Sequence, residues 1–340
     1  MSDALTRALG ALARGERLGE DLVAAAFAVL MSGSAPPTRA AALLMGLRVQ
    51  GETGSELAGA ARALRAVMRR VDLPGMSEAV DTCGTGGGTV ATFNVSTAAA
   101  FVAVGAGARV AKHGNRSYTS RCGSADVLEA LGVDLTQTAA RAAAVLARAG
   151  MVFLFAPEFH PAMRYVAPVR RELAVPTIMN LVGPLANPAA VRRQVVGVAD
   201  AERAPVVADA LARLGTEHAL VVHGAVGMDE IAPTGLTQVW EIRDGGVATW
   251  SLDPARHGLE HRDLGALRGG EPGDNARRIE CLLADPARDH AARCATVLNA
   301  GAAVYVAGLA PTVADGFGLA GAALEDGRAA GALAALRAAT

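Results

Sequence analysis

Apolar residues recur at helical spacing through the first 70 residues of the chain. This periodicity predicts amphipathic helices, and Gly15, Gly33 and Gly51–Gly54 separate them. Ser55 is a suitable N-cap, and Pro36–Pro37 stand where the start of a helix tolerates proline. The expected helices are Asp3–Arg14, Glu20–Met31, Thr38–Val49 and Ser55–Arg70. Their Ala, Leu and Met faces exceed what short helices bury among themselves, which predicts a dimer interface.

After Val71–Gly75 the pattern changes, because short apolar stretches now alternate with helical segments. Such alternation is typical of an α/β domain with a largely parallel sheet. The expected strands are Ala79–Thr82, Arg109–Lys112, Met151–Phe155, Gln194–Ala199 and Ala219–His223. Thr237–Arg243 and Val247–Ser251, joined through Asp244-Gly245-Gly246, predict a β-hairpin. From Asn275 to Ala338 the pattern is helical again.

The fold class expected is therefore α/β, in a chain of 340 residues that is long enough for a large packed core. We expect a small all-helical N-terminal domain, residues 1–72, followed by a large α/β domain, residues 73–340, with a mostly parallel central sheet. Part of 160–190 is a candidate for packing back on the helical domain.

Two polar loops stand at the carboxyl ends of the first two expected strands, where ligands gather in open α/β sheets. Their glycines leave room for a ligand, and N–H groups and hydroxyls at the start of a helix favour an anion. The residues concerned are Gly84, Gly86, Gly87, Gly88, Asn94, Ser96 and Thr97 in the first loop, and Lys112, His113, Asn115 and Arg116 in the second. The buried helix and strand expected between the loops would join them as a phosphate site. The glycine loop matches neither the Walker loop nor the dinucleotide fingerprint.

The charge balance restricts the classes of partner. The chain has 32 basic and 33 acidic residues and a formal net charge of −1, so it has no global basic field for nucleic acid or an anionic membrane. Lys112 is the only lysine, and every other cationic side chain of the Lys/Arg class is Arg. An ammonium retained in the second polar loop favours a contact with phosphate oxygens.

The cysteines are Cys83, Cys122, Cys281 and Cys294, with no CxxC pair and no zinc-site spacing. We expect reduced, mostly buried thiols in a cytoplasmic protein. The N-terminus has no signal-peptide pattern, and the longest apolar run, Leu22–Met31, is too short to span a bilayer. The sequence predicts a soluble protein.

Several other side chains have weaker claims to chemistry. His113 is either a base or a ligand contact, whereas His160 and His223 are interpreted as satisfied structural histidines. Asp229 and Glu230 follow a strand end, and two carboxylates beside a phosphate loop suit Mg²⁺. Among the arginines of a helix broken at Pro168, one is expected to pair with a carboxylate-bearing ligand. The sequence alone does not choose among Arg164, Arg170 and Arg171.

Taken together, these motifs resemble the anthranilate phosphoribosyltransferases, tryptophan-pathway enzymes of the nucleoside phosphorylase-like (type III) phosphoribosyltransferase fold. The resemblance covers nearly the whole chain. Its motifs, in order, are GTGG…TFNVST, KHGNRS…GSADVLEALG, HPAM…PVRREL…NLVGPLANP, VVHG…DEI and NA…AVYVAG. It implies a Mg²⁺-dependent homodimer that binds phosphoribosyl pyrophosphate (PRPP) and anthranilate.

The resemblance also implies a role for each matching residue. Lys112, His113 and Arg170 would be catalytic, the anthranilate contacts would be Gly84, Asn115 and Arg170, and the magnesium ligands would be Ser96, Asp229 and Glu230. The PRPP site would comprise Gly84, Gly87, Gly88, Thr92, Asn94, Val95, Ser96, Thr97, Lys112, His113, Gly114, Asn115, Arg116, Ser117, Tyr118, Thr119, Ser120 and Ser124.

The chain departs from the family pattern inside the two loops. The family usually reads GTGGDG, and here the acidic position is Gly88 and the next glycine is Thr89. Tyr118 and Cys122 replace smaller or hydroxylated residues. The expected chemistry is displacement of pyrophosphate by an amine that is already unprotonated, which requires orientation and charge stabilisation but no strong base.

Two other functions compete with this one. A pyrimidine nucleoside phosphorylase of the same fold would normally carry a further C-terminal domain. A non-catalytic paralogue that binds nucleic acid would have a basic surface and would lose Asn115 and Arg170, both of which are present.

Overall fold

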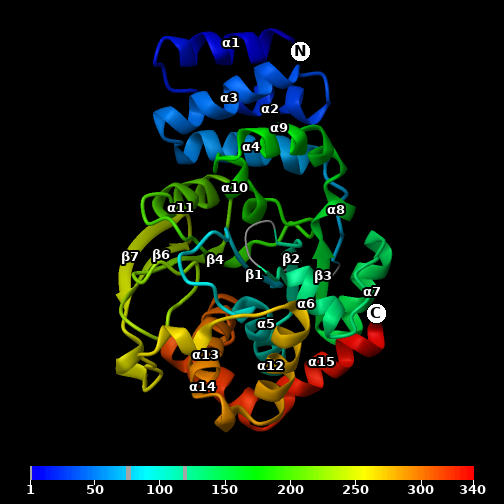
Figure 1. Cartoon of the computed structure of the whole chain (residues 1–340), viewed down its shortest axis with the longest axis vertical. Helices are drawn as coiled ribbons and strands as arrows, with labels where there is room; N and C mark the ends of the chain where they lie inside the picture. Colours follow the sequence, from blue (N-terminus) through cyan, green and yellow to red (C-terminus); the bar gives the residue numbers. More distant parts are fainter. Residues whose placement is uncertain (1, 74–77, 118–120) are drawn as a thin grey trace.

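The computed structural model describes residues 2–73, 78–117 and 121–340. Figure 1 shows a helical bundle at the N-terminal end, a central sheet below it, and the C-terminal helices on the far side of the sheet. The bundle consists of α1 (Ser2–Ala13), α2 (Glu20–Met31), α3 (Pro37–Gln50) and α4 (Gly54–Val67). The small helical and larger α/β parts that the periodicity predicted are confirmed.

Local capping determines where α4 begins. The Thr53 hydroxyl accepts a hydrogen bond from the Glu56 N–H at 3.2 Å, and the Glu56 carboxylate accepts one from the Thr53 N–H at 2.8 Å. This reciprocal pair is a capping box, so the expected N-cap at Ser55 was wrong by two residues. Glu56 is buried and also accepts from the Leu18 N–H at 3.1 Å, which fixes the preceding loop against the helix.

A seven-stranded sheet, counted over the described residues, forms the centre of the molecule in the order β3-β2-β1-β4-β5-β6-β7. The first five strands are parallel and the last two form an antiparallel hairpin. The strands are β1 (Val80–Gly84), β2 (Val110–Gly114), β3 (Met151–Phe155), β4 (Arg193–Gly197), β5 (His218–Gly224), β6 (Thr237–Arg243) and β7 (Gly246–Leu252). At the hairpin turn, Asp244 and Gly245 have φ angles of 51° and 77°, as a type I′ turn requires.

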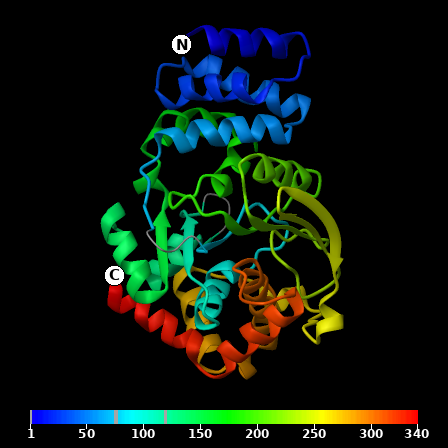
Figure 2. The ribbon, with the colours of Figure 1, turned by 180° about the vertical axis from the view of Figure 1, so that it is seen from behind.

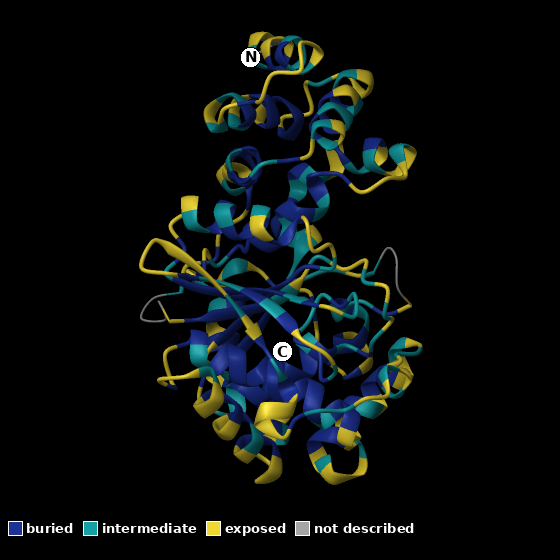
Figure 3. Cartoon of the chain, turned by 90° about the vertical axis from the view of Figure 1, so that its left-hand side faces the viewer, coloured by how far each residue is buried: buried dark blue, intermediate teal, exposed yellow. Residues whose placement is uncertain are grey.

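Alternate residues of the central strands face two different cores, because side chains in a strand alternate between faces. Val195 of β4 and Leu220 of β5 belong to the core shared with the C-terminal helices. Val196 and Val221 belong to the core shared with the N-terminal bundle. Figure 3 shows the middle of the molecule mostly in the dark blue of buried residues, with exposed residues on the outer turns of the helices.

The remaining helices are α5 (Val95–Gly105), α6 (Ser124–Ala130), α7 (Ala139–Ala149), α8 (Ala156–Phe159), α9 (Ala167–Leu173), α10 (Met179–Val182), α11 (Ala204–Arg213), α12 (Pro272–Ala284), α13 (His290–Val306), α14 (Val313–Glu325) and α15 (Arg328–Ala339). Most of them lie around the sheet, whereas α9 packs against α3 of the bundle. Seen from behind in Figure 2, α10 and α11 lie between the bundle and the sheet, whereas α13 to α15 lie below the sheet.

The bundle buries part of its apolar surface within the same chain. Ala162, Val166 and Ile178 lie in one core with α1 to α4 and with α11. A buried ion pair supports this contact, because the Arg203 guanidinium donates to both carboxylate oxygens of Glu52 at 3.0 Å. The expected break at Pro168 was displaced: α9 begins at Ala167, so the proline occupies its first turn, where it costs no hydrogen bond.

All four cysteines are free. Cys122 and Cys294 are buried, Cys83 is half-buried and Cys281 is exposed on α12, so the expectation of mostly buried thiols holds for only two of the four. Over the described ranges, no helix combines the length and the apolar character needed to cross a membrane.

Candidate active site

The glycine loop after β1 is held by the acidic loop after β5. The Gly86 N–H donates to Asp229 Oδ2 at 2.8 Å, and the Thr89 N–H donates to the Gly227 carbonyl at 3.0 Å. A Cβ on Gly84 would lie 2.5 Å from Asp229 Oδ2, and one on Gly197 would lie 1.5 Å from the Asp229 carbonyl oxygen. These two glycines are therefore required by the approach of the acidic loop itself. Gly86 and Gly87 differ, because they adopt positive φ angles of 68° and 80° with open space beside them.

Asp229 and Glu230 form a half-buried acidic pair. Burial and the neighbouring Asp229 charge raise the pKa of Glu230 to about 8, although a hydrogen bond from the Thr92 hydroxyl at 3.2 Å opposes the rise. Burial also raises the pKa of Asp229, and the Gly86 N–H opposes it. Two neighbouring, partly buried carboxylates that repel each other favour a bound cation.

Hard oxygen donors of this kind fit Mg²⁺, which keeps waters and phosphate oxygens in its remaining positions. No group of three or more His, Cys, Asp or Glu with metal-binding geometry occurs in the part of the chain that the structure describes. Ser96, the third expected ligand, lies in the first turn of α5.

Lys112 lies in the middle of β2 and is 1% exposed, whereas the sequence predicted it at the end of the strand, where the second loop begins. Its ammonium donates to the Thr82 carbonyl and to Ser96 Oγ, the latter at 3.2 Å. Burial lowers the pKa of Lys112, and the nearby carboxylates of Asp81 and Glu230 oppose the shift. The only lysine of the chain therefore lies beneath the site, in contact with β1 and with the start of α5.

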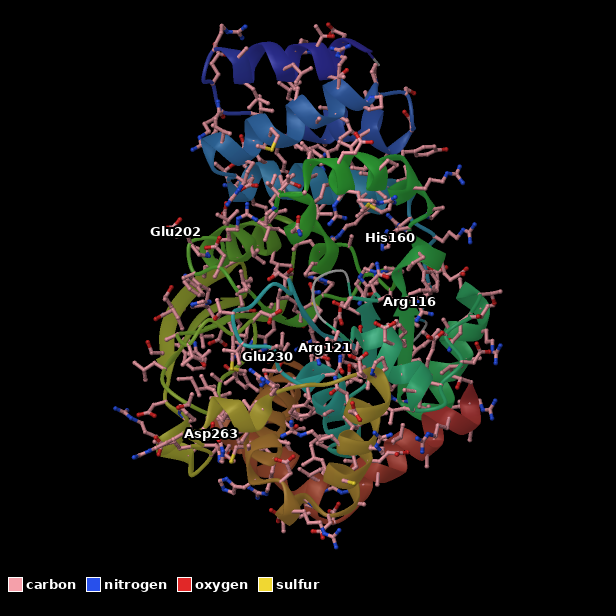
Figure 4. The ribbon with its side chains drawn as sticks, in the orientation of Figure 1. Arg116, Arg121, His160, Glu202, Glu230 and Asp263 are labelled. Atoms are coloured by element: carbon pink, nitrogen blue, oxygen red, sulfur yellow. The ribbon has the colours of Figure 1, made fainter. Side chains whose placement is uncertain are left out.

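His113 and His160 are a pair of buried imidazoles whose ring centroids lie 5.0 Å apart. Burial lowers the pKa of His113 to about 3 and that of His160 to about 4, so both rings are neutral near pH 7. His160 is buried, as expected for a structural histidine, and the backbone of Ala186 acts on its ring, although its nitrogens form no hydrogen bond of regular geometry within the described residues. His223 fits that expectation, because its Nδ1 lies 2.9 Å from the Val198 carbonyl oxygen. In Figure 4, His160 lies toward the bundle and Glu230 toward the C-terminal helices.

The described residues of the second loop make their contacts within the loop and with α6. The Arg116 guanidinium pairs with Asp126 at 2.9 Å and with Glu129 at 2.5 Å, which directs it toward α6. Asn115 accepts from the Arg116 N–H at 2.8 Å, and its carbonyl lies 3.4 Å from the Ser124 hydroxyl. The Ser117 N–H donates to Asp126 at 3.3 Å.

Other expected contacts are placed differently. Val95 and Thr97 are fully buried in α5, so their side chains face the core. Asn94 precedes that helix without capping it, and its side-chain oxygen accepts from the Asn275 amide at 2.9 Å. Arg170 is half-buried on α9. The expected contacts Tyr118, Thr119 and Ser120 lie outside the described residues.

This architecture matches that of known proteins. Residues 6–68 match the model of the glycosyl transferase family helical bundle domain, and residues 76–330 match that of the family's a/b domain. An anthranilate phosphoribosyltransferase from Rubrobacter xylanophilus is 50% identical over 97% of this chain and 95% of its own length. One from Caulobacter sp. (strain K31) is 46% identical over 100% of this chain and 96% of its own length.

This chain belongs to the anthranilate phosphoribosyltransferase family. Among solved structures, that of the Thermus thermophilus enzyme has a TM-score of 0.92 at 42% identity and covers 98% of both chains. The Saccharomyces cerevisiae enzyme in complex with PRPP and Mg has a TM-score of 0.89 at 28% identity, over 100% of this chain and 98% of that one. The resemblance read from the motifs is confirmed.

Within this anthranilate phosphoribosyltransferase fold, the departures at Gly88 and Thr89 lie at the contact with the acidic loop. A Cβ on Gly88 would stand 2.9 Å from the Gly227 carbonyl oxygen and 3.4 Å from Asp229 Oδ1. The Thr89 hydroxyl lies 3.4 Å from the carbonyl oxygens of Val226 and Gly227. At this contact the glycine loop therefore meets the acidic loop through the Thr89 hydroxyl and the Gly88 backbone.

Sequence reasoning missed two polar residues beneath the site. Asp81 is fully buried in β1, and Asn187, which is 3% exposed, donates to it at 2.8 Å. The available signal was a lone carboxylate inside an apolar strand, because a buried charge requires partners. No comparable signal marked Asn187, which stands in a loop with ordinary turn residues.

Proposed function

We propose that this protein transfers the phosphoribosyl group of PRPP to the amine of anthranilate, with release of pyrophosphate, as a step of tryptophan biosynthesis. The main observation in support is the set of contacts that joins three distant segments. Gly86 bonds to Asp229, Thr92 to Glu230, and Lys112 to Ser96. A diphosphate with a divalent cation needs this combination of N–H groups, hydroxyls, an ammonium and two carboxylates.

The PRPP site that we propose follows the two loops and the start of α5. The N–H groups near Gly87 and the hydroxyls of Thr92 and Ser96 would receive the pyrophosphate, with Lys112 beneath them. The full proposed set is Gly84, Gly87, Gly88, Thr92, Asn94, Val95, Ser96, Thr97, Lys112, His113, Gly114, Asn115, Arg116, Ser117, Tyr118, Thr119, Ser120 and Ser124. Arg116 would have to leave Asp126 and Glu129 to reach a ligand.

Mg²⁺ would be held by Ser96, Asp229 and Glu230. When bound, the cation stabilises the negative charge that collects on a departing pyrophosphate. The Saccharomyces cerevisiae relative in complex with PRPP and Mg supports Mg²⁺ as the metal. The raised pKa of Glu230 supports it as well, because a cation beside that carboxyl favours its ionised form.

We place anthranilate against Gly84, Asn115 and Arg170. The neutral imidazoles of His113 and His160 would form one side of this site. Arg170 would pair with the carboxylate of anthranilate. A Saccharomyces cerevisiae relative in complex with 4-fluoroanthranilate supports an aromatic acceptor of this shape. Because the lowered pKa values keep both histidines neutral, these side chains carry no positive charge beside the attacking amine.

The amine of anthranilate would attack C1 of the ribose while the bond to pyrophosphate breaks, with inversion at that carbon. An aryl amine is unprotonated at neutral pH, so its lone pair attacks directly and a proton leaves afterwards. The protein has to align two ligands and stabilise a charged leaving group. Catalysis of this kind agrees with a site rich in N–H groups and poor in tuned acid–base pairs.

We further propose a cytoplasmic homodimer with a helical domain of residues 1–72 and an α/β domain of residues 73–340. Free thiols are typical of a reducing compartment. Near the bundle, Val49, Tyr165 and Val175 are 80%, 42% and 44% exposed, which supports a second copy as their cover.

A fluorescence assay tests the proposed reaction. The protein is mixed with anthranilate, PRPP and Mg²⁺, and loss of anthranilate fluorescence is followed. Turnover is expected only when all three are present, and Asp229→Asn should reduce it. Phosphorolysis of a pyrimidine nucleoside, or binding of nucleic acid without transferase activity, would overturn the proposal.

A further inference from the structure

The two carboxylates of the proposed magnesium site stand on an irregular loop. Asp229 and Glu230 lie between β5 and β6, in a stretch that is neither helix nor strand. Mg²⁺ requires its ligands close to octahedral positions, at about 2.0–2.1 Å from the metal. The backbone of this acidic loop must therefore be held in place by groups outside it.

One such group is the side-chain amide of Asn299 on α13. Its Oδ1 accepts a hydrogen bond from the Ile231 N–H at 3.0 Å, and its Nδ2 donates to the Ile231 carbonyl at 2.9 Å. Nδ2 also donates to the Ala295 carbonyl at 2.9 Å, one helical turn earlier, which fixes the direction of the side chain. Asn299 is 6% exposed and Ile231 is fully buried, so these bonds are shielded from water.

The contact with Ile231 acts directly on the backbone of Glu230. The Ile231 N–H belongs to the planar peptide group that also contains the Cα and the carbonyl of Glu230. On the other side of this group, a Cβ on Gly224 of β5 would lie 3.1 Å from the Glu230 carbonyl oxygen. The peptide group is therefore held between the end of β5 and α13, and α13 itself packs against β1, β4 and β5.

We propose that Asn299 is a positioning residue for the magnesium site, which sets the place of the Glu230 carboxylate by holding both backbone polar groups of Ile231. This inference rests on the proposed function, because it concerns the metal ligands named there. Asn299 fixes the backbone, whereas the Thr92 hydroxyl contacts the carboxylate itself at 3.2 Å. Loss of a group that supports a metal ligand in this way typically lowers metal affinity about 10–100-fold.

The variant Asn299→Leu replaces the amide by an apolar side chain of similar size and leaves the Ile231 N–H and carbonyl without their partner. The concentration of Mg²⁺ needed for half-maximal binding of inorganic pyrophosphate, measured by calorimetry, should rise about tenfold or more. At saturating Mg²⁺, the KM for anthranilate should stay within about twofold, because its proposed contacts are unchanged.

Hydrogen exchange gives a second readout that needs no ligand. Amide exchange over residues 226–236, followed by mass spectrometry of the ligand-free protein, should be faster in N299L than in the wild type, because the acidic loop opens more easily without the two bonds to Asn299. If N299L does not fold, Asn299→Ala supplies the same two measurements, since it removes the same bonds without adding the methyl groups of leucine.

Val304→Ala is the matched control. Val304 is fully buried on the same helix, more than one turn beyond Asn299, and its side chain has no polar group. The variant should lower Tm through lost packing and leave both the Mg²⁺ dependence of pyrophosphate binding and the exchange over 226–236 as in the wild type.

Three results would overturn the inference: wild-type Mg²⁺ dependence in the Asn299 variants, unchanged exchange over 226–236, or an equal shift in V304A. The calorimetric measurement needs no turnover. A wild-type protein that binds pyrophosphate with Mg²⁺ but does not consume anthranilate would refute the proposed acceptor, and the comparison of the variants would still decide the role of Asn299.

Discussion

Acid should destabilise this protein through the His113–His160 pair. The two side chains are 8% and 4% exposed, and their rings lie against each other. Burial lowers the pKa of His113 from 6.5 to about 3, and the neighbouring His160 adds to that shift; burial also lowers the pKa of His160 from 6.5 to about 4. Both rings therefore remain neutral in the folded protein at pH values where the unfolded chain protonates them.

Proton counting gives the direction and the size of the effect. Between pH 6.5 and about 4, the unfolded chain binds more protons than the folded one, so the free energy of unfolding decreases as the pH falls. The full contribution is present above pH 6.5. Each histidine contributes a slope of up to about 1.4 kcal/mol per pH unit, and His160 alone accounts for about 2 kcal/mol between pH 8 and pH 5.

Urea unfolding of the wild-type protein and of His160→Gln at pH 8.0 and pH 5.0 measures this term. The difference at pH 8.0 gives the cost of the substitution itself, because histidine is neutral there in both states. Between pH 8.0 and pH 5.0, the variant should lose about 2 kcal/mol less stability than the wild type. Equal losses would refute the argument that burial of a neutral His160 makes the fold sensitive to acid.

Two further substitutions test the contacts between loops and between domains. In Gly88→Asp, the new Cβ would lie 3.4 Å from Asp229 Oδ1, so the substitution introduces a further carboxylate beside the acidic pair. The Mg²⁺ or PRPP dependence of turnover should therefore change. Identical kinetics across a magnesium titration would exclude a role for this position. Arg203→Ala would leave the buried Glu52 carboxylate with only the longer Arg48 contact at 3.7 Å and should destabilise the fold by up to about 3 kcal/mol, seen as a lower urea midpoint. Most of that loss should be recovered in E52Q/R203M, and an unchanged midpoint in the single variant would contradict the assignment.

Periodicity was sufficient for the architecture because the elements of this chain are regular. The stretch Met151–Phe155 was predicted with its observed bounds, and so was the first strand of the hairpin, Thr237–Arg243. Their apolar runs end at turn residues that stop a strand locally. Boundaries set by distant partners were less accurate. β2 continues to Gly114 because it pairs with Phe155 of β3, and no residue near Gly114 reveals that pairing.

The glycines of the site show a second limit. Their spacing correctly indicated a place of close approach, but Gly84 and Gly197 accommodate the backbone and side chain of Asp229, whereas Gly86 and Gly87 serve their own positive φ angles. The sequence shows that these positions lack a Cβ, but it does not show which group occupies the space. Only the fold brings Asp229 within reach, from more than a hundred residues away along the chain.

The single lysine can now be explained in an Arg-rich chain. Lys112 Nζ has the Thr82 carbonyl and the Ser96 hydroxyl as acceptors, and the residue is 1% exposed. An ammonium has three donors and a compact charge, whereas a guanidinium has five donors in a planar fork, several of which would be buried without acceptors here. Buried donors without acceptors carry a desolvation cost, which disfavours arginine at this position. Ser96 accepts a hydrogen bond from Lys112 and is also a proposed magnesium ligand. The preference for lysine at position 112 therefore follows from its contact with the proposed metal site.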